Sequence, residues 1–106
     1  MYDLASSLGV SWAPVQSAIK ADPFIPNRYA NPVHKGGRGA GGHCFIKDFS
    51  ALIEIYSKSV PKDKNGLSVL SAVEKKNIEL LLKSKKDLDL LEGVYGKKVL
   101  SKNKKK

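Results

Sequence analysis

The chain has 106 residues, a net charge of +9 and a hydrophobic content of 42%. This length and composition indicate one compact domain with a modest core, and they exclude a wholly disordered chain. The sequence contains no apolar run of about 18 residues, which excludes a membrane-spanning helix, and its single cysteine, Cys44, excludes an intramolecular disulfide. The N-terminal residues lack the basic and apolar regions of a secretory signal, so we expect a cytoplasmic protein, or one in the host cytoplasm if its source is viral.

The positive charge is concentrated in the second half of the chain. Residues 1–56 carry a net charge of +1, whereas residues 57–106 carry +8. A basic chain favours a polyanionic partner, most often nucleic acid. Because most of the charge lies in the Lys-rich C-terminal part, it is equally typical of a tail that only promotes solubility.

The N-terminal segment predicts two short helices, over residues 2–8 and 12–20, joined by a tight turn at Gly9. Glycine adopts a positive φ without steric cost, and Ser11 is a suitable N-cap for the second helix. This arrangement is typical of a helix-turn-helix, whose second helix enters the major groove of DNA. The positions expected to face inward are Leu4, Ala5, Leu8, Val10, Val15, Ala18 and Ile19.

The exposed face of the second helix would carry polar side chains that can contact bases and phosphates. Glutamine can bond adenine through two hydrogen bonds, and lysine can contact phosphate or guanine. The alternative is an ordinary pair of packed helices in which Trp12 belongs to the core. The DNA contacts expected from this helix and the segments after it are Ser11, Trp12, Gln16, Ser17, Lys20, Arg28, Lys35 and Arg38.

A glycine-rich segment at residues 35–42 predicts a hairpin tip or a flexible loop. As a slender wing it would place Arg38 in the DNA minor groove, which is about 6 Å wide; a loose surface loop is the alternative. Residues 43–47 are β-prone and predict the return strand. Asp48 predicts the N-cap of a helix over residues 49–56. Residues 35–42 lack the Gly-Lys-Ser/Thr ending of a P-loop, which argues against a nucleotide-binding loop here.

The C-terminal part predicts a helical extension. Residues 1–58 are expected to form the first domain and residues 59–66 a polar linker. The extension covers residues 67–95, with an interruption at 84–87, and residues 96–106 are expected to be a disordered Lys-rich tail. The apolar stripe of the extension favours dimerisation as much as packing on its own domain. The dimer contacts expected from it are Leu70, Val73, Ile78, Leu81, Leu88 and Leu91.

Catalysis and metal binding have little support in the sequence. His34, His43 and Cys44 offer three soft ligands, whereas structural zinc usually takes four. Adjacent residues of a strand point to opposite faces, so Cys44 is expected to be a small buried residue. No Ser/His/Asp set or carboxylate pair has a suitable spacing. We therefore predict a protein that is not an enzyme, with no cofactor, no metal and no evident small-molecule ligand.

A combination of features in the N-terminal half carries a family resemblance. It consists of the Ala-Ser-Ser-Leu-Gly-Val-Ser turn that begins at Ala5, then Val15 and Ile19, then the Gly/Arg wing, then Phe45 and Asp48-Phe49. With these features residues 4–56 resemble the MerR-type and phage excisionase-like winged-helix families, and they are similar to the N-terminal DNA-binding domains of phage Mu repressor and transposase. The resemblance implies that the second helix reads bases and that the wing contacts the DNA backbone or minor groove.

The sequence thus predicts a mainly α fold with a small β-hairpin, a winged helix-turn-helix with a helical C-terminal extension. The expected function is sequence-specific binding of duplex DNA, as a small transcriptional regulator or an excisionase-like architectural factor of a phage or mobile element. A homodimer is a further expectation. The alternative is a non-enzymatic protein-interaction module that docks on a host or assembly partner through Trp12 and the leucine-rich C-terminal helix.

Overall fold

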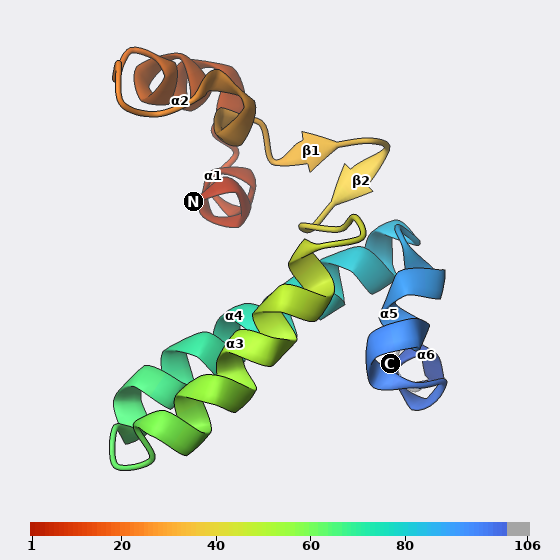
Figure 1. The fold of residues 1–106 in the computed structure, drawn as a ribbon. Coiled ribbons are helices and arrows are strands. Elements are labelled where there is room, and N and C mark those ends of the chain that lie inside the picture. The colour runs from red at the N-terminus through yellow and green to blue at the C-terminus, as the bar shows by residue number, and fades with distance from the viewer. Residues whose placement is uncertain (102–106) are drawn as a thin grey trace. The chain divides into compact units, whose positions relative to one another are not determined.

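The computed structural model describes residues 1–101, apart from the side chains of residues 28 and 29. These residues are mainly helical, with one small two-stranded antiparallel sheet (Figure 1). This confirms the predicted class of a mainly α fold with a small β-hairpin. The chain divides into two compact units, Met1–His34 and Lys35–Lys106, each with its own internal packing.

The first unit contains α1 (Tyr2–Ser7), α2 (Trp12–Lys20) and the short 3-10 helix η1 (Asn27–Ala30). Gly9 adopts a φ of 69° in the turn between α1 and α2. Ser11 occupies the N-cap position of α2, although its side chain makes no capping hydrogen bond. The two N-terminal helices and the glycine turn between them are therefore confirmed.

Trp12 organises the interior of the first unit. Its indole Nε1 donates a hydrogen bond to the carbonyl oxygen of Ala30 at 3.1 Å, and its ring meets that of Tyr2 edge to face, with centroids 5.5 Å apart. Ala5 and Ala30 are buried. Two short helices and one 3-10 turn cover little apolar surface, so several positions predicted to face inward are exposed. These are Leu4, Leu8, Val10 and Ala18.

Strands β1 (Val33–His34) and β2 (Gly37–Arg38) form the hairpin. Both residues of its turn have positive φ, 51° at Lys35 and 82° at Gly36. The predicted return strand over residues 43–47 is wrong, because a helix begins within that stretch.

Helix α3 (Phe45–Ser59) takes the place of the predicted strand. Its N-cap is Cys44, and Asp48 lies in its first turn rather than at the N-cap. Ile46 is buried in the core of the second unit, and this tertiary packing outweighs the β-propensity of the local sequence. The predicted domain boundary after residue 58 falls inside this helix.

Helix α4 (Lys64–Ser84) runs back alongside α3 (Figure 1). The connection between them is closed by Asp63, the N-cap of α4. Its carboxylate accepts hydrogen bonds from the Gly66 amide at 3.0 Å and from the Tyr56 hydroxyl. This capping satisfies one of the free N–H groups at the start of α4.

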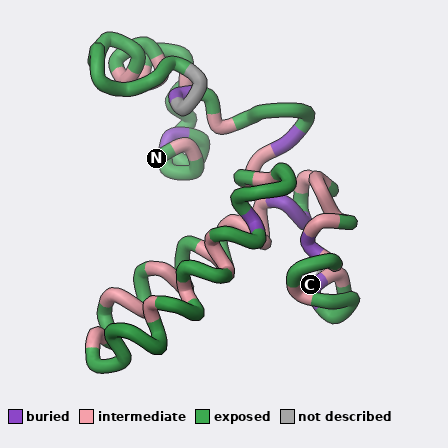
Figure 2. The backbone as a smooth tube through the Cα atoms, in the orientation of Figure 1, coloured by how far each residue is buried: buried purple, intermediate pink, exposed green. Residues whose placement is uncertain are grey.

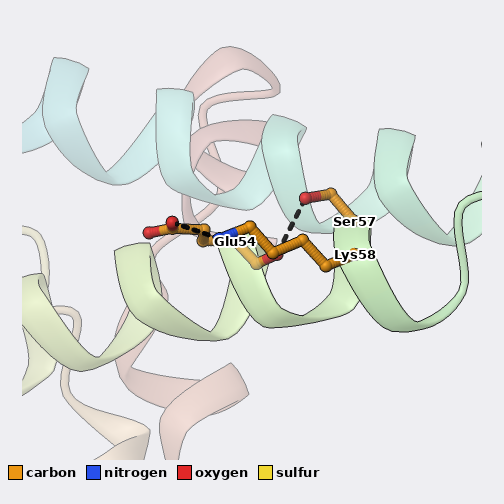
Figure 3. Close-up of polar contacts among 3 residues, drawn as sticks. All are labelled: Glu54, Ser57 and Lys58. Atoms are coloured by element: carbon orange, nitrogen blue, oxygen red, sulfur yellow. Dashed lines mark hydrogen bonds and ion pairs between the residues drawn. The ribbon is translucent and has the colours of Figure 1, made fainter.

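Helix α3 carries local polar contacts among three exposed residues, Glu54, Ser57 and Lys58 (Figure 3). Lys58 Nζ lies 3.0 Å from Glu54 Oε1, four residues earlier, and the Ser57 hydroxyl donates to the Glu54 carbonyl oxygen at 2.8 Å. A pair with Glu on the N-terminal side of Lys is the favourable orientation, and it contributes about 0.3–0.5 kcal/mol.

Helices α5 (Leu88–Tyr95) and α6 (Lys98–Ser101) complete the second unit. Figure 2 shows buried residues near the start of α3, at the end of α4 and in the two short helices. The break before α5 occurs where it is predicted, since α4 ends at Ser84 and Lys85 adopts a φ of 52°. The core residues are Ile46, Leu81, Leu82, Leu91 and Val99.

The segment predicted to be a disordered tail contains α6. Val99 in this helix is buried in the core, with 6% of its surface exposed. Residues 102–106 of the predicted tail lie outside the described residues. Within residues 1–101, no helix combines the length and the apolar character needed to cross a membrane.

Candidate functional site

Residues 37–42 of the glycine-rich segment lie against the end of α4 and the start of α5. Side chains of α4, of the turn after it and of the N-cap residue of α5 hold their backbone through hydrogen bonds. These run from Arg38 N–H to Ser84 Oγ (2.8 Å), from Ala40 N–H to Asn77 Oδ1 (2.6 Å), from Asn77 Nδ2 to the Ala40 carbonyl (2.9 Å), from Lys86 Nζ to the Gly39 carbonyl (2.9 Å) and from Gly42 N–H to Asp87 Oδ2 (2.8 Å).

The glycines of this segment permit close approach to the protein's own helices. A Cβ on Gly39 would lie 2.9 Å from Cγ of Leu81, and Gly39 also has a φ of 99°. A Cβ on Gly41 would lie 2.0 Å from Oδ2 of Asp87. Neither position has room for a side chain, so the glycines serve packing here.

After the segment and His43 comes Cys44, the N-cap of α3, whose side chain is exposed. The Cys44 carbonyl accepts the amide of Asp48 at 2.9 Å, which opens the helix. The rings of Phe45 and Phe49 stack with centroids 5.5 Å apart. A shallow, open groove on this part of α3 is lined by Cys44, Phe45, Asp48, Phe49 and Leu52.

The start of α3 gathers three reactive or charged groups. Residues three and four positions apart lie on the same side of a helix, so Lys47 and Asp48 follow Cys44 on one side. Both are exposed, whereas Ile46, which lies between Cys44 and Lys47, is buried in the core and fixes the rotation of the helix. A thiol, an ammonium group and a carboxylate therefore occur within one turn. An exposed thiol is a potential nucleophile.

The residues predicted to contact DNA are divided between the two units. Six of the eight belong to the first unit and two to the second. Trp12 is occupied by Tyr2 and Ala30 in the interior of its unit. The side chain of Arg28 lies outside the described residues. Exposed members are Ser11, Ser17, Lys20 and Lys35, and half-buried members are Gln16 and Arg38.

The predicted wing is not a free loop. The N–H of Arg38 is bonded to Ser84 at the end of α4, and the backbones of Gly39, Ala40 and Gly42 are bonded to Lys86, Asn77 and Asp87, respectively. The sequence predicts a slender wing that enters the DNA minor groove, but the backbone of these residues is covered by the chain's own side chains.

Most of the predicted dimer contacts belong to the core of the second unit. Leu81 and Leu91 are fully buried, and Ile78 and Leu88 pack against them. Leu81 and Leu91 have no exposed surface and cannot also contact a second subunit, whereas Ile78 and Leu88 are only half-buried. The two predicted contacts outside this core are Leu70 and Val73.

Sequence reasoning missed the residues around the glycine-rich segment. Cys44 was predicted to be buried in a strand and is exposed at a helix N-cap. The one local signal is a cysteine two residues after a run of glycines, in a stretch whose pattern predicts a hairpin. Asn77 and Asp87 had no signal, because they are 37 and 45 residues from their partners. Among the described residues, no group of three His, Cys, Asp or Glu side chains could hold a metal ion.

The sequence profile of the UDP-glucose/GDP-mannose dehydrogenase family, central domain, matches residues 1–79. No curated protein and no solved structure matches the chain. The family match overturns the resemblance to winged-helix DNA-binding families. The expected DNA-binding regulator, its duplex DNA partner, the alternative of an interaction module and the expectation of a non-enzyme are wrong with it.

The prediction of a DNA-binding domain was wrong because the helix-turn-helix spacing describes only how two neighbouring helices are joined and does not specify what they bind. A pair of short helices with a glycine turn also occurs as an ordinary packed pair, and Trp12 forms such a pair here. The matched residues include that pair, the glycine-rich segment, Cys44 and most of α4. The match spans well over half of the chain, and the protein belongs to the UDP-glucose/GDP-mannose dehydrogenase family.

Proposed function

We propose that this chain takes part in the dehydrogenation of a nucleotide sugar, with its site at Cys44 and the groove beside it. The observation that carries the proposal is the family match over residues 1–79, which spans the glycine-rich segment and all of α3. Cys44 is the single thiol of the chain and is exposed in that groove.

The groove supplies the groups that such a reaction can use. Dehydrogenation of a carbon that bears a hydroxyl group gives a carbonyl carbon, and a thiol can add to it. The new bond joins Cys44 Sγ to the carbon, the C=O π bond opens, and the oxygen takes up the thiol proton. Asp48 lines the same groove and can accept a hydrogen bond from a sugar hydroxyl. The stacked rings of Phe45 and Phe49 offer an apolar wall to a sugar or a base.

A dehydrogenase also needs a hydride acceptor, such as a nicotinamide dinucleotide. A dinucleotide site uses a parallel sheet and a glycine-rich turn whose free N–H groups face the pyrophosphate. The sheet within residues 1–101 is a two-stranded hairpin, and the N–H groups of Arg38, Ala40 and Gly42 already donate to side chains. The described residues therefore do not fit the dinucleotide, and we assign none of them to it.

Alkylation of Cys44 tests the proposed site in the chain as it exists. Because Cys44 is the single cysteine, the rate of iodoacetamide labelling followed by mass spectrometry reports on one position. We expect millimolar UDP-glucose or GDP-mannose to slow labelling at least fivefold, and free glucose at the same concentration to leave it unchanged. Labelling rates that neither nucleotide sugar alters would contradict a site at Cys44.

A matched pair of variants on α3 separates groove binding from a general effect. Phe49 lines the groove, so Phe49→Ala should remove most of the protection. Ile55 is an exposed apolar residue of the same helix outside the groove, so Ile55→Ala should keep it. Equal protection in the two variants would place the nucleotide sugar elsewhere on the chain.

A further inference from the structure

Asp87 occupies the N-cap of α5 but does not cap it. Its φ is 52°, in the left-handed region, and its side chain makes no capping hydrogen bond. The carboxylate instead accepts the amide of Gly42 at 2.8 Å, across 45 residues of sequence. An aspartate at this position usually bonds the first turn of its own helix. The left-handed backbone and the missing capping bond both destabilise this turn. The bond from the Gly42 amide is formed in place of the cap.

The bond to Gly42 lies two residues before Cys44. On the other side of Cys44, two residues later, Ile46 is buried against Leu81 and Leu91. The exposed thiol is thus held between two fixed points. One is a backbone amide bound to α5, and the other is a side chain in the core. Gly42 itself has a φ of 86°, so the direction in which the chain enters α3 depends on this one left-handed residue.

The approach of Asp87 to the segment is tight. A Cβ on Gly41 would lie 2.0 Å from Asp87 Oδ2, so the carboxylate occupies the space that a side chain would need. Asn77 bonds both backbone groups of Ala40, the residue before Gly41. The segment therefore approaches Cys44 with few free backbone torsions.

We propose that Asp87 is a positioning residue for the Cys44 thiol, acting through the amide of Gly42. This inference rests on the proposed function, because it assigns to α5 the control of a thiol that the proposed reaction uses. Asp87 lies beyond residue 79, where the family match ends, so the match does not assign it this role.

Three variants test the proposal in the full chain, under conditions in which denaturant titration shows each to be folded. Asp87→Ala removes the acceptor, Asp87→Asn keeps a carbonyl oxygen in its place, and Asp89→Ala removes an exposed carboxylate from the same helix as a control. The readouts are hydrogen exchange of the Gly42 amide, the pH dependence of Cys44 alkylation, and protection of Cys44 by UDP-glucose.

We expect Asp87→Ala to speed exchange of the Gly42 amide at least tenfold, to displace the pH curve of alkylation, and to reduce protection at least threefold. Asp87→Asn should bring the exchange rate and the degree of protection to within about twofold of the wild-type protein. Its pH curve of alkylation should coincide with that of the wild-type protein. Should Asp87→Ala fail to fold, Gly41→Ala provides the same test. The Cβ of an alanine at position 41 would take the space of the Asp87 carboxylate and displace it from the Gly42 amide.

The proposal is overturned if Asp87→Ala matches Asp89→Ala in all three readouts. It is also overturned if Asp87→Asn and Asp87→Ala displace the pH curve equally, since the effect would then be one of charge. The proposed function fails separately, through lack of protection in the wild-type protein. In that event Gly42 exchange and the pH curve still decide the positioning role.

Discussion

Asn77 binds both backbone groups of Ala40. Its Oδ1 accepts the Ala40 amide at 2.6 Å, and its Nδ2 donates to the Ala40 carbonyl at 2.9 Å. A carboxamide carries an acceptor and a donor side by side, so Asn77 offers Ala40 the pair of bonds that a neighbouring strand would offer. The glycine-rich segment leaves the hairpin after Arg38. Beyond that point the Asn77 side chain provides the backbone pairing that a strand would provide.

Asn77→Ala should lower the free energy of unfolding by about 1–2 kcal/mol, because two partly solvated hydrogen bonds are lost. Asn65 is exposed in the first turn of the same helix, and Asn65→Ala should change stability by less than about 0.5 kcal/mol. Urea titration followed by circular dichroism measures both. Equal stability of the two variants would show that the bonds to Ala40 contribute nothing.

Gly39→Ala should destabilise the protein by more than about 2 kcal/mol. The new Cβ would lie 2.9 Å from Leu81 Cγ, and the φ of 99° strains any residue with a side chain. Gly93 gives the opposite control, since it lies within α5 with nothing within 4 Å of a built Cβ. Gly93→Ala should raise stability by about 0.5–1 kcal/mol, because alanine favours a helix. Thermal melts of both variants should therefore shift in opposite directions.

Leu81→Ala should cost about 2–5 kcal/mol, as expected for a cavity left by a fully buried leucine. Leu81 is 0% exposed, whereas Val69 on the same helix is 62% exposed. Val69→Ala should stay within about 0.5 kcal/mol of the wild-type protein. A comparable loss in both variants, measured by denaturant titration, would contradict the assignment of the core.

Asp63 should make stability depend on pH. Hydrogen bonds from the Tyr56 hydroxyl and then the Gly66 amide lower the pKa of Asp63 in the folded chain. Because the folded-state pKa lies below that of the unfolded chain, the contribution of Asp63 is present above the ordinary aspartate pKa of about 3.9 and is lost as the pH falls through the folded-state pKa. The stability difference between the wild-type protein and Asp63→Asn should be constant from about pH 5 to 8 and shrink below about pH 4. Urea titrations across this range measure it, and a difference unchanged at pH 3 would speak against the capping role.

The sequence carries local signals well and distant ones poorly. Gly9 and Ser11 mark a turn and a helix start through their own backbone preferences, and the start of α2 follows from them. The start of α3 could not be found in this way. Phe45 and Ile46 are β-prone, and the burial of Ile46 against α4 and α5 decides the outcome.

The site was hidden for a related reason. A glycine-rich segment is equally compatible with a groove of DNA, a phosphate group or another part of the same protein, and composition does not distinguish among them. Asn77 and Asp87 make the choice, and they are far away in the sequence. Whether Cys44 is exposed depends on where α3 begins. The wrong prediction of a strand over residues 43–47 therefore also gave a buried Cys44 and concealed a potential nucleophile.

The helices that hold the glycine-rich segment have a consequence for anyone who would shorten this protein. A recombinant fragment that ends at residue 79, where the match to the dehydrogenase family ends, would keep Cys44. It would lose three of the four side chains that hold the preceding segment, together with most of the core of the second unit. The lost residues are Leu81, Leu82, Ser84, Lys86, Asp87, Leu91 and Val99. Boundaries for expression are therefore better taken from the contacts of α5 and α6 than from the extent of the family match.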